Sequence, residues 1–144
     1  MPLKNYTTDI SAIKSLGEIQ GNLAAHGAVS IMINYNANRD PESLSFIVPT
    51  RHGDIPFRLP SNVAAVQKVL DNQMAGGRNK PGQAARVTWR IIKDWVEAQM
   101  ALIETQMVTV TQVFLPYAQT ESGKTIYELF ESKQFKGMAL PAPK

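Results

Sequence analysis

The side chains of this sequence that point to chemistry are basic, and they are concentrated in its middle third. Residues 51–93 contain eight lysines and arginines against two aspartates, a net charge of +6. Residues 94–131 reverse the sign, with six acidic residues against one lysine, a net charge of −5. A segment of one sign can attract a polyanion at a distance and hold its phosphates by releasing counterions. The pattern favours a non-catalytic nucleic-acid-binding protein.

The predicted phosphate contacts come from a helix face, a linker and a strand. Three cations of the long helix expected after Pro81 are spaced four and three residues apart, so they share one side of that helix. The glycine-rich linker 76–82 adds two more, and long cations on a flexible segment can adapt to a phosphate backbone. Tyr35 or Trp89 could stack single-stranded bases. The six predicted nucleic-acid-binding residues are Arg58, Arg78, Lys80, Arg86, Arg90 and Lys93.

The same helix face also has a purely structural interpretation. Arg90 and Asp94 stand four residues apart, as do Lys93 and Glu97. Pairs at this spacing can form within a helix and are typical of an ordinary solvated surface. The sequence leaves both interpretations open.

The acidic segment supports an alternative function from another class. Glu121, Glu128 and Glu131 stand beside Tyr127 and Phe130, so this part of the chain could imitate nucleic acid or dock on a basic partner. The protein would then be a protein-binding module that inhibits or recruits a host factor. The expected partner is therefore either nucleic acid, single- or double-stranded, or a host protein.

Two short segments are similar to catalytic or nucleotide-binding motifs, and neither is complete. Arg51-His52-Gly53-Asp54 places a cation, an acid/base group and a carboxylate on one turn, where consecutive side chains usually splay apart. Gly123-Lys124-Thr125 matches the end of a phosphate-binding loop, but Ala118 stands where that motif needs its first glycine. We therefore predict no enzyme, no cofactor and no metal site.

Length and composition indicate one domain. A chain of 144 residues can bury about 68–70% of its unfolded surface, which is enough for one core. The sequence contains no cysteine, and no apolar run approaches the roughly 20 residues of a membrane span. No secretory signal is recognisable, so we expect a cytoplasmic protein. We predict a domain over residues 1–136 and a mobile tail over 137–144, which has little to bury.

Alternation of apolar and polar residues with a period of two predicts strands. The connector 36–41 is rich in turn-forming residues and favours a hairpin between the first two strands. Pro56 favours an edge position for the third, because proline donates no ladder hydrogen bond. A weaker signal at 6–10 indicates a further edge strand. The three main predicted strands are residues 29–35, 43–48 and 55–59.

Capping signals and apolar stripes predict the helices. Ser15 and Glu18 fit a capping box, and Gly27 supplies the left-handed residue that ends the first helix. The longest helix is apolar over more than half its circumference, so it should be covered on two sides, and its surplus apolar surface indicates a homo-oligomer. Residues 108–117 are β-branched and apolar, which predicts either a strand or a packed extended segment. The predicted helices are residues 15–26, 62–74, 83–107 and 124–135.

Together these elements predict an α+β fold, with a small antiparallel sheet of three or four strands packed against the long apolar helix. The predicted order is (β)-α-β-β-β-α-α-(β)-α. The order over residues 15–74 resembles the α-β-β-β-α topology of double-stranded RNA-binding domains, and its β-β-β-α part is similar to phage single-strand annealing proteins. Both resemblances concern topology, and both imply a nucleic-acid-binding class of fold.

A second resemblance is carried by short phrases spread over most of the chain. They are similar to a family of small uncharacterised proteins of bacteriophages and integrated elements. That resemblance implies a setting, namely a phage or prophage accessory protein made in a bacterial cytoplasm. The phrases are Tyr6–Thr8, Gly17–Gln20, His26–Ala28, Gly53–Pro60, Trp89–Ile103 and Val113–Tyr117.

Overall fold

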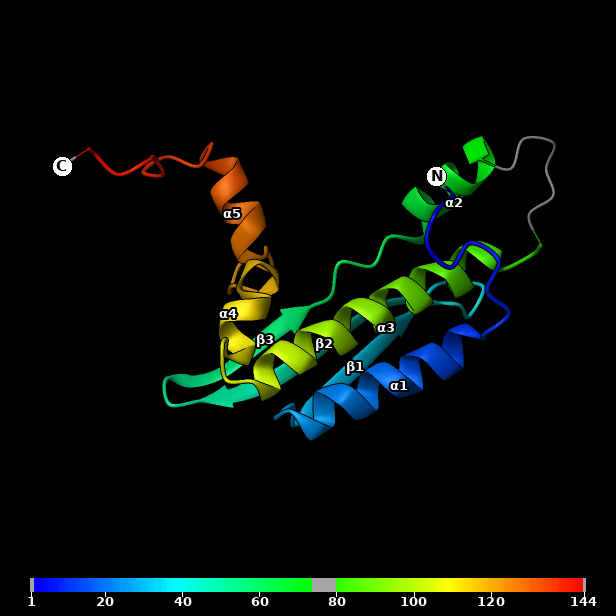
Figure 1. Ribbon diagram of the computed structural model, residues 1–144, viewed down its shortest axis with the longest axis horizontal. Coiled ribbons are helices and arrows are strands. Elements are labelled where there is room, and N and C mark those ends of the chain that lie inside the picture. Colours follow the sequence, from blue (N-terminus) through cyan, green and yellow to red (C-terminus); the bar gives the residue numbers. More distant parts are fainter. Residues whose placement is uncertain (1, 74–79, 144) are drawn as a thin grey trace.

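The fold is built on a three-stranded antiparallel sheet. A computed structural model describes residues 2–73 and 80–143 of the chain. The strands β1 (Ser30–Tyr35), β2 (Pro41–Thr50) and β3 (Gly53–Arg58) follow one another in space as they do in sequence. Period-two alternation and the turn-rich connector therefore predicted the strands and the first hairpin correctly, and the α+β class is confirmed (Figure 1).

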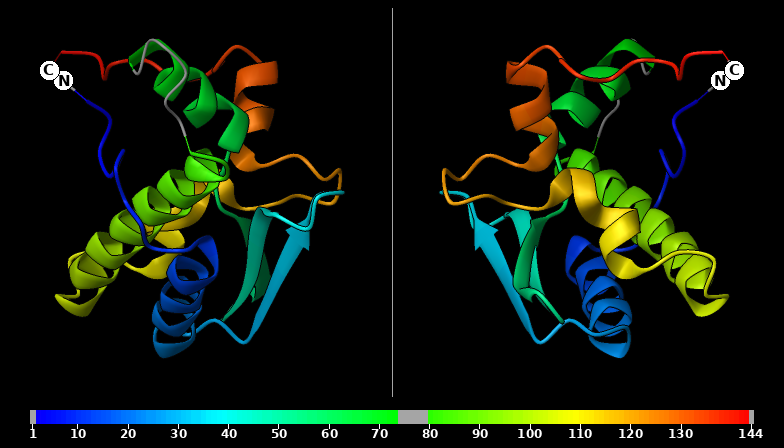
Figure 2. Two further views of the ribbon diagram at one scale, coloured as in Figure 1. Left: turned by 90° about the vertical axis from the view of Figure 1, so that its right-hand side faces the viewer. Right: turned by 90° about the vertical axis from the view of Figure 1, so that its left-hand side faces the viewer.

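Two helices cover one face of this sheet. Helix α1 (Ala12–Ala25) and helix α3 (Gln83–Glu104) lie side by side on that face (Figure 2). Inward-facing residues of the strands, such as Phe46 and Phe57, meet the apolar sides of both helices in one core. Trp89 of α3 lies at the centre of this core with no exposed surface, and its indole N–H donates to the Pro41 carbonyl at 3.3 Å.

A smaller apolar cluster lies at the beginning of α3. Helix α2 (Val63–Gln73) packs there, and Leu70 of α2 contacts Val87 of α3 together with Tyr6 of the N-terminal segment. The side chain of Asn62 accepts a hydrogen bond from the Ala65 N–H at 3.0 Å, which caps α2 at the predicted place. Helix α3 is therefore covered by α1, by the sheet and by α2.

The C-terminal part of the chain is joined to the core mainly through Phe114. Its ring lies 5.4 Å from Phe46, 6.2 Å from Phe57 and 5.5 Å from Trp95, measured between ring centroids. Phe114 ends helix α4 (Val110–Phe114), which the short 3₁₀ helix η1 (Leu115–Tyr117) and helix α5 (Ile126–Ser132) follow. The chain between η1 and α5 touches the outer edge of β3, where the Gln119 N–H donates to the Pro56 carbonyl at 2.8 Å. Helix α5 and the chain after it project from one end of the molecule (Figure 1).

Residues 110–117 form α4 and η1, so the prediction of a strand or an extended segment over residues 108–117 was wrong. The Thr109 side chain accepts from the Gln112 N–H at 3.1 Å, and the Gln112 side chain accepts from the Thr109 N–H at 2.8 Å. This is a complete capping box, and it starts a helix in spite of the β-branched residues. Residues 6–10 are not a strand either, because turns closed by the Tyr6 and Thr8 N–H groups occupy the beginning of that segment.

The beginning of α1 also differs from the prediction. Its N-cap is Ser11, whose side chain accepts from the Lys14 N–H at 3.1 Å, one turn before the predicted Ser15. Ser15 lies within the helix and is buried. Both Ser15 and Glu18 are instead engaged with an arginine of α3. The predicted end of this helix is confirmed, since Gly27 has a φ of 108°.

Candidate functional site

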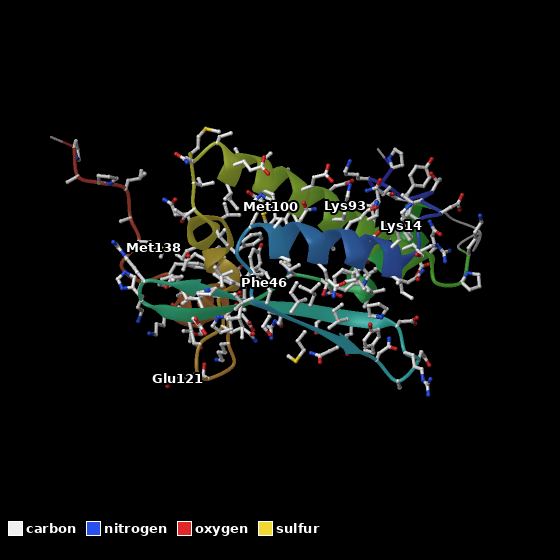
Figure 3. All side chains as sticks on the ribbon, turned by 90° about the horizontal axis from the view of Figure 1, so that it is seen from below. Lys14, Phe46, Lys93, Met100, Glu121 and Met138 are labelled. Atoms are coloured by element: carbon white, nitrogen blue, oxygen red, sulfur yellow. The ribbon has the colours of Figure 1, made fainter. Side chains whose placement is uncertain are left out.

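Arg58 and the cations of α3 lie on opposite sides of the sheet. Side chains alternate between the two faces of a strand, and Phe57 points into the helix-covered core, so Arg58 points to the other face. There its guanidinium donates to Oε1 of Glu128 in α5 at 2.8 Å. Lys93, by contrast, lies on the helical side of the sheet (Figure 3). The described residues among the six predicted contacts therefore do not share one surface.

Arg90 is a buried structural residue. Only 6% of it is exposed, and its two terminal nitrogens donate to Oε2 of Glu18 in α1 at 2.9 and 2.5 Å. Its Nε donates to the Ser15 hydroxyl at 3.3 Å. These contacts tie α1 to α3, so Arg90 is not available to a phosphate backbone. The intrahelical pair with Asp94 that the spacing allowed is replaced by this contact between helices.

Lys93 is surrounded by carboxylates. Its Nζ lies 2.7 Å from Glu97, 3.5 Å from Asp94 and 3.8 Å from Glu18. The hydrogen bond to Glu97 raises the pKa of Lys93 above its ordinary value, in spite of an opposing effect of burial. The predicted pairing of Lys93 with Glu97 is confirmed, and the positive charge of Lys93 is compensated within the protein.

Of the two cations in the linker, Lys80 and Arg78, the structure describes only Lys80. The Lys80 ammonium lies 3.7 Å from Asp9, and both side chains are largely exposed, so this pair is weak. Arg78 lies outside the described residues. Trp89, one of the two aromatic residues considered for base stacking, is fully buried and cannot serve.

Arg86 differs from these residues because its partner is neutral. Its Nε and Nη2 donate to Oε1 of Gln83 at 2.9 and 2.6 Å. Gln83 is itself buried, and its Nε2 donates to the carbonyls of Tyr6 and Thr8 at 3.0 and 3.1 Å. Among the described residues, no carboxylate lies within 4 Å of the Arg86 nitrogens. The guanidinium is thus held in place while its charge stays uncompensated.

Arg86 lies in a groove of about 230 Å³ that the sequence analysis did not anticipate. The groove runs between the N-terminal ends of α1 and α3 and the connection from β1 to β2. We call it the Tyr35 groove, after the tyrosine at the end of β1, which is 56% exposed. The other residues that give it its chemistry are Ile13, Arg39, Asp40, Gly82 and Arg86.

A second candidate surface lies on and after α5. No residue of this helix is buried, and Tyr127 and Phe130 are 49% and 41% exposed. Gln134 and Phe135 both adopt left-handed backbone conformations and turn the chain back, so that the Phe135 ring lies 6.0 Å from Tyr127. We call this the aromatic surface, and it comprises Tyr127, Phe130, Phe135 and Met138.

The acidic residues near the aromatic surface are not equivalent. Glu128 accepts from the Thr125 N–H and hydroxyl at 3.0 Å each, and it also binds Arg58. The hydrogen bond from the Thr125 backbone is the main reason why the pKa of Glu128 is lowered. Glu121 lies on the loop before α5, on the side of the sheet opposite the helices (Figure 3). Glu128 therefore has a structural role, since it completes the capping box that starts α5.

The residues of the two motifs that were considered for catalysis or nucleotide binding have structural roles within their own turns. Arg51 donates to Nε2 of its neighbour His52 at 3.0 Å in the exposed turn between β2 and β3. Gly123 has a φ of 86° in the turn before α5, and Thr125 is the N-cap of that helix. No cluster of three potential metal ligands occurs within residues 2–73 and 80–143.

Comparison of the chain with protein-family models, with curated proteins and with solved structures finds no match. In the part of the chain that the structure describes, no helix combines the length and the apolar character needed to cross a bilayer. The candidate function therefore depends on the two surfaces described above.

Proposed function

We propose that this protein is a non-catalytic protein-binding module, and that the aromatic surface receives its partner. One observation carries the proposal: no residue of α5 is buried, and α5 together with the chain after it exposes three aromatic side chains and a methionine. Aromatic residues and methionine are enriched in the centres of protein interfaces. Contiguous exposed apolar patches on a soluble protein commonly mark such sites.

Exposed apolar residues are also more frequent in the C-terminal part of the sequence. Of the 13 large apolar side chains that are exposed among the described residues, eight follow residue 100. These include Leu102, Met107 and Leu115, in addition to the residues of the aromatic surface. Scattered exposed residues need no explanation, so the neighbouring residues of the aromatic surface are the ones that favour an interface.

The aromatic surface is held in a defined conformation. A capping box and the ion pair between Glu128 and Arg58 fix the beginning of α5. At its end, the left-handed conformations of Gln134 and Phe135 each cost about 1–2 kcal/mol. Such strain is found where a side chain must be positioned for function. A preorganised surface also lowers the entropy cost of binding.

The proposal is tested by capturing partners from a nuclease-treated bacterial lysate with the tagged protein. Phe130→Ser and Tyr127→Ser should each abolish capture, because they remove apolar area from the centre of the surface. Val29→Ser is the matched control, since Val29 is 66% exposed but precedes β1. Capture that survives both α5 substitutions, or that Val29→Ser also abolishes, would contradict the proposal.

A second copy of the chain is one possible occupant of this surface, as a homo-oligomer would require. Light scattering on the purified protein separates this case from binding to a host factor. A dimer that dissociates in Phe130→Ser assigns the surface to self-association.

Nucleic-acid binding by an accessory protein of phage or mobile-element origin remains a second proposal, now in a narrower form. Four of the five described residues predicted to bind phosphates are paired with carboxylates. Arg86 is the exception, and it shares the Tyr35 groove with another arginine and with an exposed tyrosine. The proposal therefore moves from the basic segment as a whole to this groove.

A further inference from the structure

We infer that the Tyr35 groove binds a nucleotide unit of single-stranded nucleic acid, with the base on Tyr35 and the phosphodiester between Arg39 and Arg86. This inference gives the second proposal a defined site. It is independent of the aromatic surface, which lies toward the other end of the molecule (Figure 1).

The position of Arg86 is the first observation. A buried glutamine anchored on two backbone carbonyls holds Nε and Nη2 of the guanidinium, and this leaves Nη1 free to donate. An arginine positioned by a carboxylate would have its charge compensated, whereas one positioned by a neutral amide keeps its full attraction for an anion. Gln83 thus acts as a positioning residue for Arg86.

Gly82 is the second observation. Its φ of 76° lies in the left-handed region, and a Cβ at this position would come within 3.3 Å of Nη1 of Arg86. The absence of a side chain at Gly82 therefore leaves room for this guanidinium at the beginning of α3. The partial positive charge of the helix N-terminus adds to that of the arginine.

Arg39 and Tyr35 complete the groove from the other side. The pairing of β1 with β2 shifts register between Asn34 and Tyr35, and such irregularities redirect side chains at the ends of strands. Arg39 lies on the following turn with a φ of 64°, and the Asn36 side chain fixes that turn by accepting from the N–H groups of Asn38 and Asp40. No ion pair of Arg39 occurs among the described residues.

The charges and the side chains that line the groove indicate which class of ligand it binds. Two arginines and one carboxylate, Asp40, leave one net positive charge, which matches the single negative charge of a phosphodiester. A free nucleotide carries a terminal phosphate of charge about −1.5 to −2 and is matched less well. The exposed ring of Tyr35 and the apolar side chain of Ile13 provide walls for a flat base. A base in a duplex is stacked and paired, so only an unpaired base can use Tyr35.

The inference is tested by fluorescence anisotropy with a labelled oligothymidine of about 12 nucleotides. One neutralised phosphodiester predicts a log–log salt dependence with a slope of about −0.7, the value for one phosphate contact on a single strand. Arg39→Ala and Arg86→Ala should each weaken binding and make this slope shallower, because each removes one of the two cations that neutralise the phosphate. Tyr35→Ala should weaken binding about tenfold without changing the slope, and Tyr35→Phe should bind like the parent protein.

The matched control is Arg51→Ala, which removes an exposed arginine at the opposite end of β2 and should leave binding unchanged. Circular dichroism of each variant confirms that it is folded. Equal affinity for a duplex of the same length, or competition by free nucleotide at equal concentration, would overturn the assignment to a single strand. Three results would refute the assignment of binding to the Tyr35 groove. They are no binding at about 0.05 M salt, binding that does not respond to salt, and a loss of binding in Arg51→Ala as large as in Arg86→Ala. Phe130→Ser should leave oligothymidine binding intact, which separates this result from the fate of the aromatic surface.

Discussion

Replacing Glu18 by alanine should destabilise the fold far more than an ordinary surface substitution. Arg90, of which 6% is exposed, would keep its charge and lose both hydrogen bonds to Glu18. Removing one partner of a buried ion pair costs about 3–5 kcal/mol, because the remaining charge is left buried without compensation. The side chain of Glu18 is 35% exposed, so water can replace part of the contact, and we expect the lower value of about 3 kcal/mol. For a chain of 144 residues this corresponds to a fall in Tm of about 10 °C.

The assay is urea-induced and thermal unfolding followed by circular dichroism. Glu97→Ala is the matched control, since it removes an exposed i,i+4 partner of Lys93 while Asp94 and Glu18 still compensate the lysine, and it should cost about 0.3–0.5 kcal/mol. The double substitution Glu18→Met with Arg90→Met should be more stable than Glu18→Ala, because it leaves no buried charge. Equal free energies of unfolding for Glu18→Ala and Glu97→Ala would refute the role assigned to the pair.

Three further predictions follow from the core, from Gly82 and from Asp94. Trp89→Ala should cost about 3–5 kcal/mol in urea unfolding, because the indole is completely buried. Gly82→Ala should cost about 1–2 kcal/mol and should also weaken oligothymidine binding, because the left-handed backbone is strained and the new methyl group would crowd Nη1 of Arg86 at 3.3 Å. Burial tends to raise the pKa of Asp94, but hydrogen bonds from Asn5 and Lys4 outweigh this effect and lower the pKa below its ordinary value of 3.8. The resulting stabilisation is present above pH 3.8 and is lost as the pH falls through the lowered pKa. Asn5→Gly removes the hydrogen bond to Asp94, and glycine suits the left-handed backbone at position 5. Acid unfolding of this variant should therefore occur at a higher pH.

The sequence predicted the elements whose signals are local. Alternation of apolar residues predicted all three strands, and the apolar stripe predicted α3 from its first residue, although the helix ends at Glu104 and not at the expected residue 107. At 108–117, two local signals conflict. The β-branched residues favour a strand, whereas Thr109 and Gln112 favour a helix, and the helix forms because its capping box is complete and Phe114 reaches the core.

The candidate sites could be predicted only in part, because they depend on contacts between distant segments. Glu18 and Arg90 are 72 positions apart, so no local pattern indicates that they pair. The Tyr35 groove likewise joins the first hairpin to the beginning of α3, about 50 residues further along the chain. The individual side chains were recognisable in the sequence, as Arg86 and Tyr35 were, but their distances and their compensating charges were not.

Because the C-terminal part is attached to the core mainly through Phe114, its exposed residues can be substituted with little effect on the core. From residue 109 onward, only Phe114, Ala118 and Thr125 are buried among the described residues, while the aromatic surface lies beyond them. Substitutions at Tyr127, Phe130 or Phe135 therefore leave the stabilising interior almost untouched. If the aromatic surface receives a partner as proposed, substitutions there can change which partner it binds without weakening the core, as long as Phe114 is retained.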